Sequence, residues 1–149
     1  MQPLQSHNPA HHRPMKWIQL SVFLENKPGA LSEPCRLLAK AGINIQTFSL
    51  ADTREFGILR LVVEDSEKAR RLLQRNGFAV KATKVVVLEV ADRPGGLAAI
   101  LDALDGTGIS VKYAYGFTVK PGNKGVLVFS FDDPDSATEV LKKKGMNLV

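Results

Sequence analysis

Two short stretches of the chain combine residue types that could bind a small ligand. The first, NKPGAL, begins at Asn26, and the second, DRPGGL, begins at Asp92. In each, an apolar run ends in Asn or Asp, and Pro-Gly precedes a segment with a helical pattern. Unpaired N–H groups at the start of a helix attract a carboxylate, and the Asn or Asp side chain can hold an ammonium or amide group. These corners could therefore grip both ends of a free amino acid.

The same residues also suit a purely structural role. Gly29 and Gly95 permit the close approach of another backbone or of a ligand. Pro28 and Pro94 fix the direction of the turn. Because a tight turn that begins a helix needs the same residues, the corners alone leave both interpretations open.

Side chains that commonly carry out catalysis are scarce in this sequence. The three histidines, His7, His11 and His12, all lie in the amino-terminal stretch MQPLQSHNPAHHRPM. Their position argues against a His-based metal site, a Ser-His-Asp triad or a Cys-His pair in the folded part. Cys35, the single cysteine, lies in an expected helix, where it is expected to pack, and it leaves no internal disulfide. We therefore expect no catalytic residue, no metal and no cofactor, and a protein that is not an enzyme.

The charge distribution makes nucleic acid and membranes poor candidates as partners. Much of the formal net charge of +5 comes from SEKARRLLQRNG, where basic and apolar residues alternate as on an amphipathic helix. We interpret these basic residues as a solvated outer face, because no aromatic residues interleave with them and no helix-turn-helix spacing appears. The sequence has no run of about 18 apolar residues, and the amino terminus lacks the apolar centre of a signal peptide. A cytosolic location is the expectation.

The chain repeats one unit. Between residues 26 and 44, each match lies 66 residues further along, and beyond the next hairpin the offset becomes 68, as for Gly57 and Gly125. Two extra residues in the hairpin VKPGNKG explain the change, and hairpin loops tolerate such insertions well. The sequence therefore predicts a duplicated domain.

Each unit reads in the order strand, helix, strand, strand, helix, strand. For unit 1 we expect strands at 16–25, 43–52, 58–64 and 78–82, one helix capped by Ser32 and a second capped by Asp65 or Ser66. For unit 2 we expect strands at 84–91, 109–119 and 125–131, helices at 95–105 and 134–143, and a short final strand. The fold class is α+β, with two ferredoxin-like βαββαβ units, each an antiparallel four-stranded sheet with helices on one face. The expected divisions are a disordered tail at 1–15 and domains at 16–82 and 83–149. Because FAVKATKVVVLEV is nearly continuous strand sequence, the units should be joined stiffly.

The two corners, set in this order of elements, resemble the ACT domain. That domain is a small regulatory module of amino-acid-metabolism enzymes and also occurs in stand-alone tandem proteins. The resemblance covers residues 16–149. It implies that a small ligand, most often an amino acid, binds between paired domains. Because the edge strands of such sheets pair readily, we expect a homodimer or a larger assembly. A partner enzyme in trans is the natural candidate for regulation.

The resemblance places the ligand site at the turn after the first strand and at the start of the second strand. In unit 1 these positions are Asn26, Pro28, Gly29, Ala30 and Leu31, with Asn44 facing them. In unit 2 they are Asp92, Pro94, Gly95, Gly96 and Leu97, with Ser110 opposite.

Two departures from the family pattern affect the expected ligand. Serine-sensing members have a histidine two residues before the Asn, where this chain has Leu24 in unit 1 and Val90 in unit 2. A ligand with a more apolar side chain is therefore expected, and unit 1 is favoured as the better amide-lined site. An alternative is the regulatory small subunit of acetolactate (acetohydroxyacid) synthase, which responds to branched-chain amino acids. The complete second unit argues against that alternative.

Overall fold

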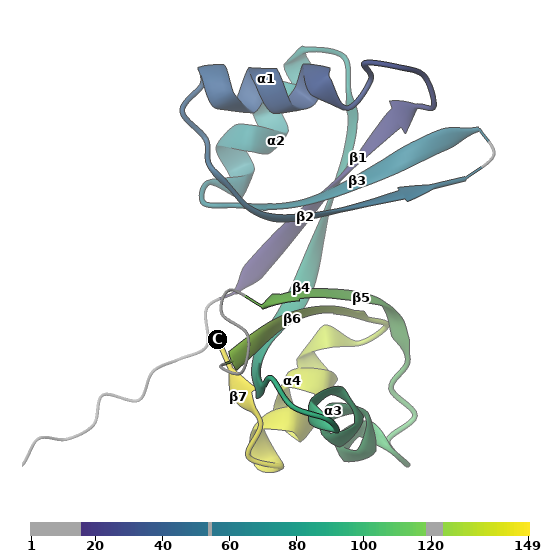
Figure 1. Cartoon of the computed structure of the whole chain (residues 1–149), viewed down its shortest axis with the longest axis vertical. Coiled ribbons are helices and arrows are strands. Elements are labelled where there is room, and N and C mark those ends of the chain that lie inside the picture. Colours follow the sequence, from purple (N-terminus) through teal and green to yellow (C-terminus); the bar gives the residue numbers. More distant parts are fainter. Residues whose placement is uncertain (1–15, 54, 119–123) are drawn as a thin grey trace, which may run out of the picture.

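The computed structural model describes residues 16–53, 55–118 and 124–149, which form two units stacked along the long axis of the molecule (Figure 1). In chain order, the elements are β1 (Trp17–Glu25), α1 (Ser32–Lys40), β2 (Ile45–Asp52), β3 (Phe56–Val63), α2 (Ser66–Arg75), β4 (Ala79–Ala91), α3 (Gly96–Leu104), β5 (Val111–Thr118), β6 (Lys124–Phe131), α4 (Pro134–Lys143) and β7 (Asn147–Leu148). Both units have the βαββαβ order, so the predicted fold class is confirmed. The predicted tail at 1–15 lies outside the described residues.

The two units share one strand. The strands follow the order β2-β3-β1-β4-β6-β5, with β7 also paired to β4, and all ladders are antiparallel. Residues 79–85 of β4 pair with β1, and residues 86–91 pair with β6. The expected stiff connection is therefore a single continuous strand, and the boundary predicted between residues 82 and 83 falls inside it.

Each unit packs its own helices on one face of its sheet. In unit 1, Leu20 and Val22 of β1 are fully buried together with Leu38 of α1 and Leu73 of α2. The core of unit 2 has the same construction, from Leu88, Ile100, Phe129 and Leu141. The alternation of apolar residues along β1 thus points one set of side chains at the helices.

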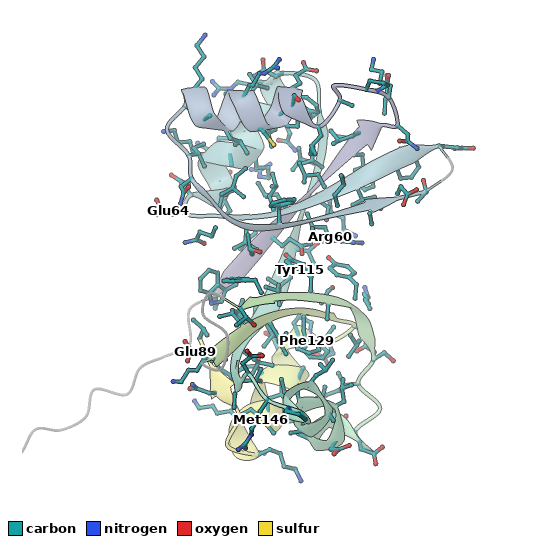
Figure 2. The ribbon with its side chains drawn as sticks, in the orientation of Figure 1. Arg60, Glu64, Glu89, Tyr115, Phe129 and Met146 are labelled. Carbon is teal, nitrogen blue, oxygen red and sulfur yellow. The ribbon has the colours of Figure 1, made fainter. Side chains whose placement is uncertain are left out.

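The opposite faces of the two sheets meet between the units (Figures 1 and 2). Val85, Val87 and Val128 form a third buried cluster there. Polar residues are also buried at this level, with Gln19 fully and Ser21 almost fully removed from solvent. The helices consequently lie on the outer sides of the molecule, and the central layer is sheet against sheet.

The helix starts agree with the sequence only in part. Asp65 caps α2 by accepting a hydrogen bond from the Lys68 N–H at 3.0 Å, as predicted. The predicted cap of α1, Ser32, is wrong, because Leu31 already has helical backbone angles and occupies the cap position. The Ser32 N–H donates instead to the Gly29 carbonyl at 3.1 Å.

Within the described residues, no helix is long and apolar enough to span a membrane.

Candidate functional site

The first corner joins β1 to α1 through a short turn with defined hydrogen bonds. The Lys27 N–H donates to the Glu25 carbonyl at 3.0 Å, and the Ala30 N–H donates to the Lys27 carbonyl at 3.3 Å. Gly29 has φ of +82°, a left-handed conformation that favours glycine. The Asn26 side chain is exposed. The corner therefore carries an exposed polar side chain between the end of β1 and the start of α1.

The second corner repeats this geometry with a tighter entry into the helix. The Arg93 N–H donates to the Ala91 carbonyl at 2.9 Å, and Gly95 has φ of +90°. α3 begins at Gly96, whereas the matching position of unit 1 is Ala30, two residues before the start of α1. A Cβ atom on Gly96 would lie 2.7 Å from the Ala91 carbonyl oxygen. The early helix start thus depends on glycine at residue 96.

A groove of about 490 Å³ runs beside the second corner. Its wall contains three glycines, Gly96, Gly116 and Gly125, together with the half-buried side chains of Val90 and Leu127. Arg93 and Asp92 line its polar end. The remaining lining residues are Ala91, Leu97, Phe117 and Thr118. The groove therefore joins an apolar wall to charged side chains.

The matching positions of unit 1 carry larger side chains. Gly96 corresponds to Ala30, and Gly116 corresponds to Leu50. A Cδ atom of Leu50 lies 3.9 Å from the position that a Cβ on Gly57 would take, so Leu50 covers this part of the sheet. Unit 2 thus has glycine at two wall positions where unit 1 has a side chain, and the Leu127 side chain packs closely over Gly116, where an added Cβ would meet its Cδ atom.

The structure does not bring Asn44 to the corner of its own unit. Ile45, which follows Asn44, pairs with Val63 at one end of the sheet. The corner follows β1 at the other end, where Leu24 pairs with Gly57. Asn44 and the corner of unit 1 therefore lie at opposite ends of the sheet.

Ser110 has the corresponding place in unit 2. It precedes β5, whose first residue Val111 pairs with Phe131, the last residue of β6. The Ser110 N–H donates to the Asp132 carboxylate at 2.9 Å. A site that combines a corner with Asn44 or Ser110 thus cannot form within one unit.

The single cysteine of the chain lies in a setting that disfavours its reactivity. Cys35 is partly buried in α1, and burial raises the pKa of its thiol, which disfavours the reactive thiolate. Within residues 16–53, 55–118 and 124–149, no group of three or more His, Cys, Asp or Glu residues could hold a metal ion.

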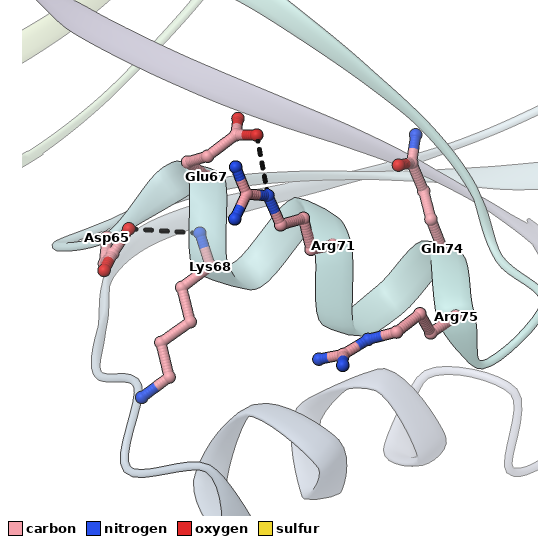
Figure 3. A pocket seen from close by; sticks show the side chains of 6 residues that line it. All are labelled: Asp65, Glu67, Lys68, Arg71, Gln74 and Arg75. Carbon is pink, nitrogen blue, oxygen red and sulfur yellow. Dashed lines mark hydrogen bonds and ion pairs between the residues drawn. The ribbon is translucent and has the colours of Figure 1, made fainter.

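A further depression lies away from both corners, on the outer face of α2 (Figure 3). It measures about 750 Å³, and its lining consists of Asp65, Glu67, Lys68, Arg71, Gln74 and Arg75. Arg71 Nε lies 3.1 Å from Glu67 Oε1, and the hydrogen bond from Arg70 lowers the pKa of the Glu67 carboxyl. These neighbouring charges partly neutralise one another. The face fits the interpretation of a solvated surface, and we assign no site to it.

Sequence reasoning missed a polar cluster between the two units. The Arg60 guanidinium lies 3.7 Å from the centre of the Tyr113 ring, a cation–π contact, and Figure 2 shows Arg60 and Tyr115 at the boundary between the units. Arg60 Nε is buried without a hydrogen-bond partner in the described part of the chain. Period-two alternation marks these positions as facing away from the helices, but it does not reveal a second sheet there.

The glycine groove was missed too, although Gly116 inside an expected strand is a sign of close approach by another group.

The comparisons with known proteins agree with this architecture. The family described as ACT domain pair matches residues 15–149. A solved structure from Bacteroides thetaiotaomicron is 40% identical, covers 91% of this chain and 93% of its own, and has a TM-score of 0.85. The ligand-free regulatory subunit of aspartate kinase from Thermus thermophilus is 13% identical, with coverage of 87% and 93% and a TM-score of 0.63. The structure of aspartokinase alpha and beta subunits is 18% identical, with coverage of 85% and 90% and a TM-score of 0.59. A search of curated proteins gave no match.

Proposed function

The chain belongs to the family of ACT domain pairs, and on that premise we propose that it is a non-enzymatic regulatory protein that binds a small amino acid at its Pro-Gly corners. ACT domains are regulatory modules rather than catalytic ones. The observation that carries the proposal is the double occurrence of one corner. In each, Asn or Asp directly follows the last residue of a strand, and the chain then turns through a left-handed glycine into a helix.

The proposed ligand contacts follow from the chemistry of the corners. N–H groups at the start of α1 or α3 receive the carboxylate of the amino acid, and Asn26 or Asp92 receives its ammonium group. In unit 2 the ligand side chain would lie in the groove against Val90, Leu97 and Leu127. These apolar contacts support an amino acid with an aliphatic side chain. Although the amide of Asn26 favoured unit 1 at the level of sequence, the groove makes unit 2 an equally strong candidate.

Regulation would occur by a shift in population. A ligand that binds one packing of the domains more tightly than another moves the equilibrium toward that packing. We propose a cytosolic homodimer that acts on a partner enzyme of amino-acid metabolism in trans. The similarity to regulatory subunits of aspartate kinase supports the fold of such a module. No observation favours the alternative of a regulatory small subunit of acetolactate synthase, since both units are complete.

A thermal-shift screen of the purified chain against the twenty amino acids tests this proposal. A ligand at about 100 times its dissociation constant should raise the free energy of unfolding by about 2.7 kcal/mol, which shifts the melting temperature visibly. We expect a selective shift that Asn26→Ala or Asp92→Ala reduces. Asp105→Ala, which removes an exposed carboxylate at the far end of α3, is the matched control and should leave the shift unchanged. A flat screen, or a shift that neither corner variant changes, contradicts the proposal.

A further inference from the structure

We propose that the outer face of α3 docks an amphipathic helix of a partner protein, one that carries aliphatic side chains beside basic ones. The face consists of Leu97, Ala98, Leu101, Asp102 and Asp105, and we call it the α3 face. That this chain acts on a partner rests on the proposed function. The docking surface itself rests on the composition and exposure of α3 and does not require an amino acid at the corners.

The helix α3 is apolar almost all round. Eight of its nine residues are Gly, Ala, Leu or Ile, and Asp102 is the exception. A helix of this composition is normally covered on every side, because a solvated helix needs a polar face. Yet the buried residues of α3 are Ile100, Ala103 and Leu104, and Figure 1 shows the helix on the side of unit 2 that faces away from unit 1. The composition therefore predicts a cover that the described residues do not provide.

Two leucines form an apolar stripe on the α3 face. Leu97 is 50% exposed and Leu101 is 42% exposed. Because they are four residues apart, they lie on one side of the helix, about 6 Å from each other along its axis. Ala98, which is also exposed, lies next to Leu97. Such a stripe suits a partner helix that anchors aliphatic side chains from successive turns.

The matching helix of unit 1 has an ordinary solvated outer side. Glu33 and Lys40 of α1 are both exposed. With the offset of 66, the same positions of unit 2 hold Ala99 and Gly106. Both helices pack on the same face of their sheets, so the fold does not require an apolar outer side. The stripe is therefore a particular feature of unit 2.

The C-terminal end of α3 carries negative charge without a counter-charge. Among the helices that the structure describes, α1, α2 and α4 have Lys or Arg in the last turn, whereas α3 has none. Asp102 lies in that turn, and Asp105 directly follows the helix. Both carboxylates add to the negative end of the helix dipole. Neither forms an ion pair within residues 16–53, 55–118 and 124–149, so this end of the face attracts a cation.

The stripe and the charge together define the chemistry of the partner. Its helix needs two aliphatic side chains one turn apart to cover Leu97 and Leu101. It also needs Lys or Arg about one turn further on, about 6 Å along the axis, to meet Asp102 and Asp105. The same face of a second chain would bring further carboxylates instead of the cation. Charge complementarity thus favours a different protein with a basic amphipathic helix.

Depressions on both sides of α3 give such a helix room to pack. Leu97 belongs to the groove of about 490 Å³ beside the second corner. Ala99 lines another depression of about 550 Å³, together with Met146 and Asn147. Helices pack by inserting the side chains of one into the grooves of the other. Because Leu97 also lines the groove proposed for the ligand side chain, a docked partner and a ligand would be neighbours.

Titration with a synthetic peptide tests the docking. The probe is a helical peptide of about four turns, made of leucine and lysine with the leucines three and four residues apart, added to the isotope-labelled full chain. We expect the amide signals of residues 97–105 to move and to saturate, while those of α1 stay in place. A peptide with glutamate in place of lysine should bind at least about tenfold more weakly. Unmoved α3 signals, or equal binding of the two peptides, would overturn the proposal.

Matched variants locate the contact. Leu101→Lys changes an exposed position to another good helix former, so circular dichroism should show a folded chain. We expect it to bind the leucine–lysine peptide about tenfold more weakly, because it loses apolar contact and adds a like charge. Asp102→Asn should weaken binding mainly at low salt, and Arg36→Gln, at the matching exposed position of α1, should leave binding unchanged. Unchanged binding by a folded Leu101→Lys would overturn the proposal.

Sedimentation velocity separates docking of a partner from self-association. We expect the full chain and Leu101→Lys to have the same mass. A smaller mass for Leu101→Lys would show that the α3 face joins two copies of this chain, and it would overturn the docking of a different protein.

The thermal-shift screen keeps this inference distinct from amino acid binding. A selective shift with an amino acid, without binding of the leucine–lysine peptide at α3, would refute the docking alone. Peptide binding at α3 without a shift from any amino acid would support the docking and refute amino acid binding at the corners.

Discussion

Tyr115 of unit 2 donates a hydrogen bond to Gln19 of unit 1, with Oη and Oε1 2.7 Å apart. The Gln19 amide in turn donates to the Tyr113 hydroxyl at 2.6 Å. Gln19 is fully buried, so one side chain satisfies two hydroxyl groups of the other unit in the layer between the sheets. A buried network of this kind fixes the relative position of the two units, because any slip leaves polar groups unpaired.

Replacement of Gln19 should destabilise the whole chain. Gln19→Leu leaves the hydroxyl groups of Tyr113 and Tyr115 without their partner, and we expect the free energy of unfolding to fall by about 1–3 kcal/mol. Urea denaturation monitored by circular dichroism measures this loss. Gln74→Leu, an exposed change on α2, is the control and should alter the stability by less than about 0.5 kcal/mol. Equal losses in the two variants would contradict the role of the network.

Burial should keep Tyr115 from ionising in the folded protein. Removal from solvent raises the pKa of Tyr115 above its ordinary value, and the neighbouring Tyr113 raises it further. Stability is then fully present below the ordinary tyrosine value of about 10 and falls as the pH rises above it. The chain has two tyrosines, so Tyr113→Phe leaves Tyr115 as the single reporter. The tyrosinate absorbance of Tyr115 should rise together with alkaline unfolding. Ionisation of Tyr115 in the folded protein near the ordinary tyrosine pKa would refute the claim that burial raises its pKa.

Gly96→Ala should disturb the entry into α3. The new Cβ would meet the Ala91 carbonyl oxygen, which belongs to the backbone and cannot move aside easily. We expect a lower melting temperature, and amide hydrogen exchange should show a delayed start of α3 that resembles the start of α1. The reciprocal change, Ala30→Gly, serves as the control for loss of a methyl group at the matching position. An unchanged melting temperature in Gly96→Ala would show that the contact between the new Cβ and the Ala91 carbonyl oxygen does not destabilise the fold.

Asp133 should contribute to acid denaturation. The Ser136 hydroxyl and N–H donate to its carboxylate at 2.7 and 3.1 Å and lower its pKa. The stability it contributes is present above the ordinary aspartate value of about 3.9 and is lost as the pH falls through the lowered value. Asp133→Asn does not titrate, so its melting temperature should decline less steeply below about pH 4. The decline of the melting temperature with falling pH should be intermediate in Ser136→Ala, between that of the unchanged chain and that of Asp133→Asn. The same decline in all three proteins would show that the Asp133 carboxylate does not contribute to acid denaturation.

Much of the fold could be predicted because the sequence contains the same pattern of strands, helices and corners twice. The alternation that places Leu20 and Val22 toward the helices recurs in the second unit, and the repeated Pro-Gly corners fix where strands turn into helices. The corner residues of the candidate site were found in the same way. Local signals of this kind act over a few residues and are readable in one sequence.

The arrangement between units could not be predicted, since it depends on contacts distant in sequence. The sequence pattern predicts that Gln19 is a solvent-facing polar residue, but the second sheet covers it and hydrogen-bonds to it. The separation of Asn44 from its own corner appears only when the strand register is known. Residue type favours Ser32 as a helix cap, but the helical backbone angles already begin at Leu31.

The most direct test of amino acid binding at the corners is a titration of the isotope-labelled chain followed by its amide NMR spectrum. We expect one class of amino acid to move the signals of Gly29 and Gly95 and of the first residues of α1 and α3, and we expect these changes to saturate. Signals of the exposed face of α2 should stay in place and serve as the internal control. Signals that remain unchanged with every amino acid, or that move at α2 and not at the corners, would contradict amino acid binding at the corners.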